Sequence, residues 1–204
     1  MGFIDILISK LAPHACLGCG QEGILLCPSC TAALPDASCQ QLGVRPFVAA
    51  ATTYDSLAKD LVWRLKFQGA QAAAAIMARQ MAPLIGPDRQ EAIIVPVPTA
   101  ARRARQRGYD QAKLIAHQLV KRTGLQYHDC LCRHGQAHQV GASREQRLVQ
   151  LQTAFQVKKR LAPGSHLILV DDVLTTGATL EAAAGTLKTA GANRIDAVVF
   201  AYTE

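Results

Sequence analysis

The order of apolar and polar positions along the 204 residues predicts strands that alternate with helices. Six stretches have the length and apolar content of strands: 47–54, 92–98, 125–132, 154–158, 166–171 and 195–202. Three longer stretches have helical periodicity: 56–81, 108–122 and 176–190. Some of the strands are apolar on both faces, as strands covered by helices on both sides are. The pattern therefore predicts an α/β fold built on a parallel sheet.

The first part of the chain has a different character from the rest. Residues 1–45 are rich in turn formers, and their first eleven positions suit a short amphipathic helix. The predicted organisation is a small N-terminal module over 1–45 and one larger domain over 46–204, a size that suits a single core. A polar stretch over 133–147 lacks an apolar face and is predicted to be a loop, in part helical.

Composition excludes two classes of protein. Half of the residues are hydrophobic and 18% are charged, which is too apolar for an extensively disordered chain. No apolar run approaches the roughly 20 residues that cross a bilayer, so we expect no membrane insertion. The N-terminal residues carry an acidic residue and no basic region, unlike a signal peptide, and we expect a cytoplasmic protein.

The net charge of +7 is concentrated in one segment. Residues 96–160 hold thirteen Lys or Arg and three Asp or Glu, whereas residues 161–204 hold two and five. Such an uneven distribution suggests an anionic partner, either phosphate groups or nucleic acid. The alternative is a solvated, arginine-rich surface without a ligand.

Four of the seven cysteines form two CxxC pairs: Cys16, Cys19, Cys27 and Cys30. Each pair can bend into a knuckle that directs two thiolates at one tetrahedral ion, and seven intervening residues suit a short hairpin. Four thiolates close the coordination shell, so the predicted zinc ion is structural. Disulfides are the alternative, disfavoured by a reducing compartment. Cys39 has no partner at CxxC spacing.

The most informative segment is 167–179, where an apolar strand runs into Asp171 and Asp172 and then a Thr/Gly turn and a helix. The turn and first helical residues are Thr175, Thr176, Gly177, Ala178 and Thr179. Backbone N–H groups at a helix N-terminus can surround a phosphate, and Gly177 permits close approach. Two carboxylates repel phosphate but suit the vicinal hydroxyls of a ribose. The segment predicts a ribose 5-phosphate site, with a merely capped helix as the alternative. The sequence contains no GxxxxGK[ST] or GxGxxG motif, so neither a P-loop nor a dinucleotide-binding fingerprint is an alternative.

The pattern Asp-Asp-x-x-Thr-Thr-Gly-x-Thr resembles the PRPP-binding signature of type I phosphoribosyltransferases. Further segments resemble the ComF/GntX-like (competence protein F) family over essentially the whole chain. They are the four-cysteine module, Leu-Lys-Phe at 65–67, Val-Pro-Val-Pro at 95–98, Arg-Gly-Tyr-Asp-Gln at 107–111, residues 139–147, and Ala-Phe at 154–155. The resemblance implies a type I phosphoribosyltransferase-like parallel sheet flanked by helices, preceded by a small N-terminal zinc-finger module.

The resemblance also implies roles for charged residues. Asp171 and Asp172 would be the catalytic pair, binding PRPP together with residues 175–179. The loop after the first core strand, residues 99–108, would meet pyrophosphate through four arginines: Arg102, Arg103, Arg105 and Arg107. A loop over 133–147 would close on the site and exclude water, with Arg144 and Arg147 as phosphate contacts. Mg²⁺ would bridge the hydroxyls and pyrophosphate of PRPP.

The function that the resemblance implies is the uptake and handling of transforming DNA in natural transformation. Single- or double-stranded DNA would bind along 102–122 and 133–147, mainly through its phosphates, because no aromatic set beyond Tyr109 and Tyr127 is interleaved with the basic residues. Other competence proteins, helicase-like or DNA-processing, are expected partners. Two alternatives stay open: a conventional PRPP-dependent phosphoribosyltransferase with an unidentified acceptor, and a zinc-dependent nucleic-acid adaptor whose site does not turn over.

Overall fold

The structure of the protein is a computed structural model, and it describes residues 15–35, 47–89, 91–134 and 154–203. Five parallel strands form the main sheet in the order β1-β7-β6-β2-β3. Their bounds are β1 (Phe47–Thr53), β2 (Ile93–Pro96), β3 (Gln126–Tyr127), β6 (His166–Leu174) and β7 (Arg194–Tyr202). The central strands β6 and β7 pair over their whole length, from His166 opposite Arg194 to Leu174 opposite Tyr202. The predicted parallel α/β sheet is confirmed.

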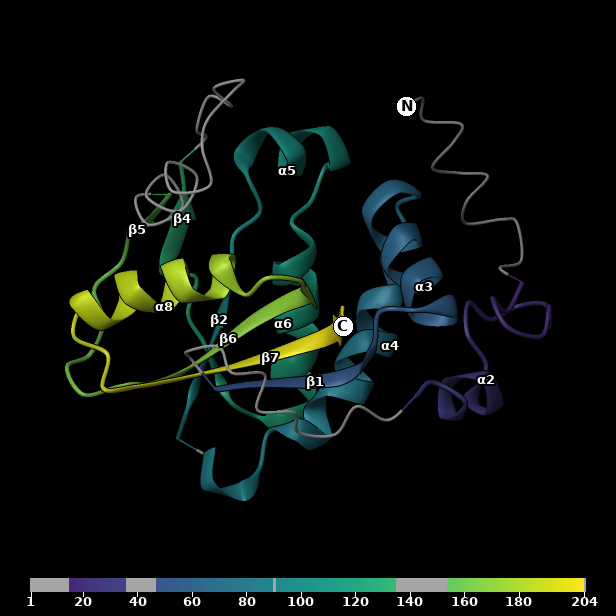
Figure 1. Cartoon of the computed structure of the whole chain (residues 1–204), viewed down its shortest axis with the longest axis horizontal. Coiled ribbons are helices and arrows are strands. Elements are labelled where there is room, and N and C mark those ends of the chain that lie inside the picture. Colours follow the sequence, from purple (N-terminus) through teal and green to yellow (C-terminus); the bar gives the residue numbers. More distant parts are fainter. Residues whose placement is uncertain (1–14, 36–46, 90, 135–153, 204) are drawn as a thin grey trace.

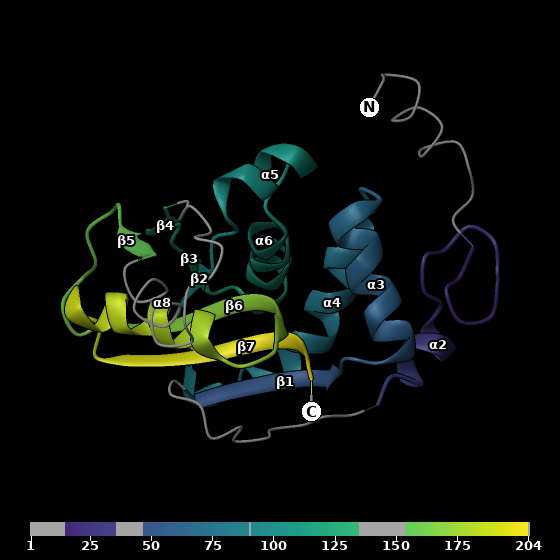
Figure 2. The ribbon, with the colours of Figure 1, turned by 45° about the horizontal axis from the view of Figure 1, so that its top comes forward.

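Helices cover both faces of this sheet, as Figures 1 and 2 show. The helices on the two faces are α3 (Ser56–Phe67), α4 (Ala72–Met81) and α6 (Gln111–Thr123) on one side and α8 (Ala178–Thr189) on the other. The structure also has α2 (Pro28–Ala32), α5 (Ala101–Arg107) and the short 3-10 turns η1 (Ala82–Leu84) and η2 (Pro87–Arg89). Successive strand residues point to opposite faces, so β6 contributes to two cores. Ile168 packs into a core with residues of α3, α4 and α6, whereas Leu167 packs into a second core with residues of α8. Within the described residues no helix is long and apolar enough to cross a membrane.

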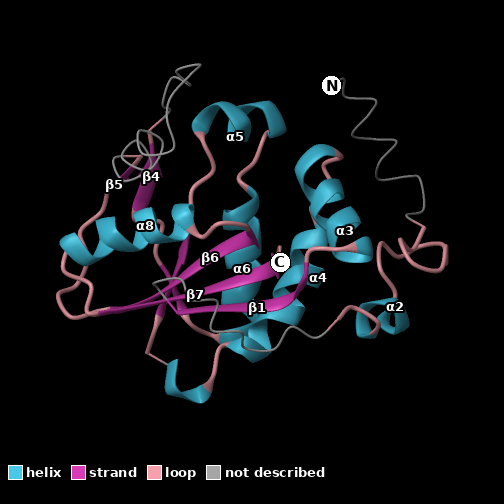
Figure 3. Ribbon diagram, in the orientation of Figure 1, coloured by secondary structure: helices cyan, strands magenta, loops and turns pink. Residues whose placement is uncertain are grey.

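Figure 3 shows where the observed elements differ from the sequence pattern. The predicted helix over 56–81 is two helices, because Gly69 adopts a left-handed conformation (φ +68°) that interrupts the first one. The predicted strand over 125–132 is also divided. Its first part is β3, and its second part becomes β4 (Leu131–Arg133), which pairs antiparallel with β5 (Phe155–Val157) in a separate small sheet. Leu131 and Phe155 are buried there against the core that α8 covers.

The four-cysteine segment packs on the edge of the larger fold. Leu25 and Leu26 are buried in the same core as residues of α3 and α4. The Gln80 amide of α4 also donates a hydrogen bond of 3.0 Å to the carbonyl of Thr31 in α2. The predicted opening helix and the predicted boundary between residues 45 and 46 lie outside the described residues.

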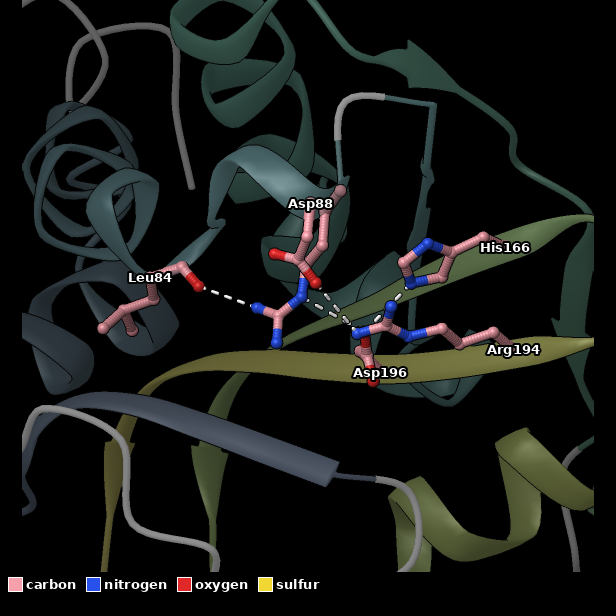
Figure 4. A network of polar contacts seen from close by, with 6 residues as sticks. Leu84, Asp88, His166, Arg194 and Asp196 are labelled. Carbon is pink, nitrogen blue, oxygen red and sulfur yellow. Dashed lines mark hydrogen bonds and ion pairs between the residues drawn. The ribbon is translucent and has the colours of Figure 1, made fainter.

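A network of buried charges closes the amino-terminal end of the sheet (Figure 4). Asp196 of β7 is 4% exposed, and its Oδ2 lies within 3.2 Å of Arg89, His166 and Arg194. Arg194 continues the network to the exposed Asp88, and an Arg89 Nη1 donates to the carbonyl of Leu84. This network stabilises the end of the sheet opposite to the carboxyl ends of the strands.

The connections that follow β2 and β6 run to opposite faces of the sheet, so the carboxyl ends of these two strands are its topological switch point. The two strands are neighbours, and the N–H of Val97 donates to the carbonyl of Val170 just past β2. The chain leaves β2 toward α6 on one face of the sheet and leaves β6 toward α8 on the other face. In open α/β sheets ligands bind in the crevice that such a divergence opens. The residues on these two connections therefore define the candidate site.

Candidate functional site

The four cysteines of the two CxxC pairs lie together, as predicted. The sulfur atoms of Cys16, Cys19, Cys27 and Cys30 all lie within 4.8 Å of one another. Those of Cys19 and Cys27 are 3.7 Å apart. Four thiolates at about 2.3 Å from one tetrahedral ion would have sulfur–sulfur separations of about 3.8 Å. The arrangement therefore fits a tetrahedral metal site made of thiolates alone.

The backbone around these cysteines supports thiolate ligands. The N–H of Cys27 donates to Cys16 Sγ at 3.3 Å, and the N–H of Cys30 donates to Cys27 Sγ at 3.4 Å. Hydrogen bonds from the backbone of Cys19 and Cys27 lower the pKa of Cys16 to about 6. A Cβ at Gly18 would lie 2.6 Å from Cys30 Sγ, so only glycine leaves room for the fourth sulfur.

The two predicted carboxylates lie within β6 and not after it, because this strand continues to Leu174. Adjacent strand residues face opposite sides of the sheet, so Asp171 and Asp172 diverge. Asp172 is 3% exposed and lies on the side of α3, whereas Asp171 is partly exposed on the side of Arg133 in β4. The sequence pattern identified both residues but predicted that the strand ends at Asp171.

Lys66, in the last turn of α3, forms a close ion pair with Asp172. Its Nζ lies 2.7 Å from Asp172 Oδ1. The other carboxylate oxygen, Oδ2, is buried and has no hydrogen-bond partner among the described residues. Because this pair joins residues that are 106 positions apart, sequence patterning had no means of detecting it.

Asp171 is held in an environment that disfavours its charge. Burial, and next the negative charge of Asp172, raise the pKa of Asp171 to about 8. The N–H of Asp172 donates to Asp171 Oδ1 at 2.8 Å and, with the more distant Lys66, partly offsets this increase. A carboxyl group poised near neutral pH in the carboxyl-terminal half of a central strand has the character of a functional residue.

The turn after β6 presents backbone donors next to these carboxyl groups. Thr175 and Thr176 are exposed, and Gly177 adopts a left-handed conformation (φ +78°) at the start of α8. Gly177 has no side chain with which to cap α8, and the hydroxyl of Thr176 accepts only a 3.5 Å contact from the N–H of Ala178. The first N–H groups of α8 are therefore available to an anion.

The arginine segment after β2 forms a helix where the family resemblance implied a loop. Residues 101–107 are α5, which contains only Ala, Arg and Gln, all good helix formers, and ends at the left-handed Gly108. Arg102, Arg103 and Arg105 are exposed on α5. Arg107 is half-buried and donates to the Gln111 side chain at 2.8 Å.

Asp110 joins the connection after β2 to the start of α6. It accepts hydrogen bonds from the backbone N–H of Thr99 at 2.9 Å and from that of Ala112 at 3.0 Å. The same carboxylate thus caps α6 and holds the residues that follow β2. Tyr109 donates its hydroxyl to the carbonyl of Leu65, which connects α5 and α6 to the end of α3.

The described residues bring part of the predicted pyrophosphate set together. Arg103 and Arg107 line a groove of about 570 Å³ together with Lys66, Phe67 and Tyr109. Arg102 and Arg105 do not line it. Arg144 and Arg147, predicted on the closing loop, lie outside the described residues.

The fold brings aromatic side chains to the basic region in addition to Tyr109 and Tyr127. Tyr127 stacks on His117 with ring centroids 4.2 Å apart, so one face of its ring is already covered. Trp63 and Phe67 of α3 instead are exposed, and Arg107 lies over the ring of Phe67 at 5.4 Å. These residues were missed because α3 precedes the basic segment by about forty positions.

Comparison with known proteins agrees with this architecture. The phosphoribosyl transferase domain family matches residues 70–204. Competence protein ComFC of Bacillus subtilis is 33% identical over 135 residues, which cover 65% of this chain and 54% of that protein. DNA utilization protein YhgH of Salmonella typhimurium is 30% identical over 185 residues, covering 81% and 78% respectively. The chain thus spans about half the length of the first relative and over three quarters of the second.

The chain therefore belongs to the phosphoribosyltransferase family, in the ComF-like group that carries an N-terminal cysteine module. Competence protein ComFC of Streptococcus pneumoniae, 26% identical over 83% of this chain and 77% of its own length, is a further relative. Among solved structures, the glutamine PRPP amidotransferase from B. subtilis is similar over 63% of this chain and 26% of its own, with a TM-score of 0.45 and 15% identity. The predicted family and fold class are confirmed.

Proposed function

We propose that this chain is a competence-type protein that binds PRPP, or a related ribose 5-phosphate, in the crevice between the carboxyl ends of β2 and β6. The observation that carries this proposal is the convergence of two features on one strand end. Asp171 and Asp172 provide oxygen acceptors, and the uncapped start of α8 provides backbone donors. A ribose 5-phosphate requires both kinds of group, at its hydroxyls and at its phosphate respectively.

Each part of the ligand has a matching part of the site. Its 5-phosphate would accept hydrogen bonds from the N–H groups of residues 175–179, and its ribose hydroxyls would donate to Asp171 and Asp172. Lys66 would keep Asp172 in place, since their ion pair of 2.7 Å is already formed. Arg103 and Arg107 suit the pyrophosphate. Mg²⁺ bound with PRPP would neutralise the charge on its pyrophosphate and favour the ionised form of Asp171.

Calorimetric titration with PRPP and Mg²⁺ tests the ribose site. The double variant Asp171→Asn/Asp172→Asn retains the shape of both side chains but removes their charge, and should lose measurable PRPP binding. Asp88→Asn is a matched control, because Asp88 is exposed at the opposite end of the sheet. Unchanged PRPP affinity in the double variant would show that the turn after β6 only caps α8.

We propose that the metal held by the four-cysteine module is zinc. Four thiolates in a tetrahedral arrangement are typical of structural zinc sites. Cys16→Ser should abolish zinc binding and unfold the module, because small metal modules depend on the ion for their stability. Cys132→Ser is the control, because Cys132 lies outside the cluster. Full zinc content in the Cys16 variant would contradict the assignment.

We propose that the protein handles DNA in the cytoplasm during natural transformation, together with helicase-like or DNA-processing competence proteins. The names of the relatives, competence protein and DNA utilization protein, support this role. The concentration of basic residues in 96–160 supports it independently. DNA affinity should fall with salt by about 0.7–0.9 log units per tenfold change for each phosphate neutralised. If no DNA binds at low salt, this part of the proposal fails, and PRPP binding is unaffected by that result.

A further inference from the structure

The outer surface of α3 exposes two large aromatic side chains next to the basic helix α5. Trp63 is 48% exposed and Phe67 is 63% exposed, and they are the large hydrophobic side chains found exposed among the described residues. The opposite side of α3 is buried through Leu61 and Leu65, so the core does not need the two aromatic rings. Four residues apart on one helix, they are neighbours, with ring centroids 6.1 Å apart and planes inclined by 43°.

The charges beside the ring of Phe67 are positive. Arg107 lies over the ring of Phe67, its Cζ 5.4 Å from the ring centroid. The groove of about 570 Å³ between the end of α3 and α5 is lined by Lys66, Arg103, Arg107, Gln106, Tyr109 and Phe67. No acidic residue lines it within the described parts of the chain. Figure 2 shows α5 and the last turns of α3 on the same side of the molecule.

We propose that Trp63 and Phe67 form a stacking surface for the bases of single-stranded nucleic acid, with Arg103 and Arg107 binding the adjoining phosphates. This inference rests on the proposed DNA binding and deepens it by naming the surface and the form of the ligand. Aromatic rings that alternate with basic residues are the usual means of binding single strands. A cation over an aromatic ring, as at Arg107 and Phe67, also suits a base that extends the stack.

The geometry favours a single strand over a duplex and over a free base. The faces of duplex bases are covered by their neighbours, so rings on a protein surface can stack only on unpaired bases. A free base would lie on an open surface and would remove little apolar area from water. A single nucleic-acid strand can instead stack successive bases on the two rings while its phosphates reach α5. The surface is therefore suited only to a polymer.

Intrinsic fluorescence gives a direct test, because Trp63 is the single tryptophan of the chain. Titration of the wild-type protein with an oligothymidylate of about 12 nucleotides should quench this fluorescence, because a stacked base contacts the indole. The same length of duplex DNA should bind more weakly and cause little quenching. Binding of the oligothymidylate without any change in Trp63 emission would overturn the proposal.

Variants separate stacking from electrostatics, with binding measured by the anisotropy of a labelled oligothymidylate. Trp63→Leu/Phe67→Leu should weaken binding by about 5- to 140-fold for one stacked base and leave the salt dependence unchanged. Trp63→Phe/Phe67→Trp retains both rings and should bind with nearly wild-type affinity. Arg103→Ala/Arg107→Ala should instead reduce the salt slope, by about 0.7 for each phosphate that the variant no longer neutralises.

The outcomes distinguish this inference from the broader proposal. If the leucine variant binds the oligothymidylate as tightly as the wild type, while the arginine variant binds less tightly, DNA binding stands and the stacking surface is wrong. If the wild type binds no DNA at low salt, both fail. All these side chains are exposed or half-buried, so circular dichroism should confirm that the variants fold.

Discussion

Replacing Asp171 by Asn should change how the stability of the folded protein depends on pH. The carboxyl group of Asp171 lies in the carboxyl-terminal half of a central strand, next to the buried Asp172, and its pKa is raised to about 8. In the unfolded chain its pKa would be close to the ordinary aspartate value of about 3.9. Asparagine retains the shape of the side chain and removes the titration.

The sign of the effect follows from proton binding. Between about pH 4 and pH 8 the folded state holds a proton on Asp171 that the unfolded state has released, so the free energy of unfolding falls as pH rises. The difference of about four between the pKa of Asp171 in the folded and in the unfolded state corresponds to at most roughly 5 kcal/mol in the free energy of unfolding, at 1.36 kcal/mol per pKa unit. Part of Asp171 is exposed, so solvent screening should reduce this to about 2–4 kcal/mol.

Urea denaturation of wild type and Asp171→Asn at intervals from pH 5 to pH 8.5 measures the effect. The variant should approach the wild-type stability near pH 5 and exceed it by about 2–4 kcal/mol near pH 8. Loss of metal from the cysteine module at low pH affects both proteins alike and cancels in the difference. Asp88→Asn, exposed and far from the site, is the control and should follow the wild type. Parallel curves for wild type and Asp171→Asn would refute the reasoning.

Three further substitutions probe other parts of the structure. Lys66→Met should destabilise the fold by about 3 kcal/mol, because it leaves Asp172 buried and unpaired. Adding Asp172→Asn should recover part of that lost stability in a double-mutant cycle. Gly18→Ala should lower zinc affinity about 10- to 100-fold in a chelator competition, because its Cβ would collide with Cys30 Sγ. Asp196→Asn should lower stability by about 2 kcal/mol, since it removes the charge with which the partly buried Arg89 pairs, while calorimetry shows unchanged PRPP affinity.

Features that depend on short stretches of chain were predictable from the sequence. The strand over 47–53, the helix over 178–189 and the last strand follow from apolar periodicity, which short-range geometry determines. The four cysteines were predictable as a cluster, because CxxC spacing itself brings two thiolates together. The acidic pair and the turn at 175–179 were predictable as neighbours at a strand–turn–helix junction, because these elements follow one another directly there.

Boundaries between elements were less predictable, because they depend on backbone conformations that periodicity does not report. The break between α3 and α4 occurs where Gly69 adopts a left-handed conformation. The stretch 125–132 has the length of one strand, yet its last residues leave the main sheet to pair with β5. The arginine segment is helical because Ala, Arg and Gln are good helix formers, although a loop was expected from the family resemblance.

The sequence by itself determined the fold class, the family and the positions of the cysteines and the acidic pair. Only the tertiary structure showed that Lys66 pairs with Asp172 and that Phe67 lies beside Arg107 of α5. The physical reason is the distance along the chain. Local patterns are read over a few residues, whereas these contacts join segments 40 to 106 positions apart, which come together only when the helices pack on the sheet.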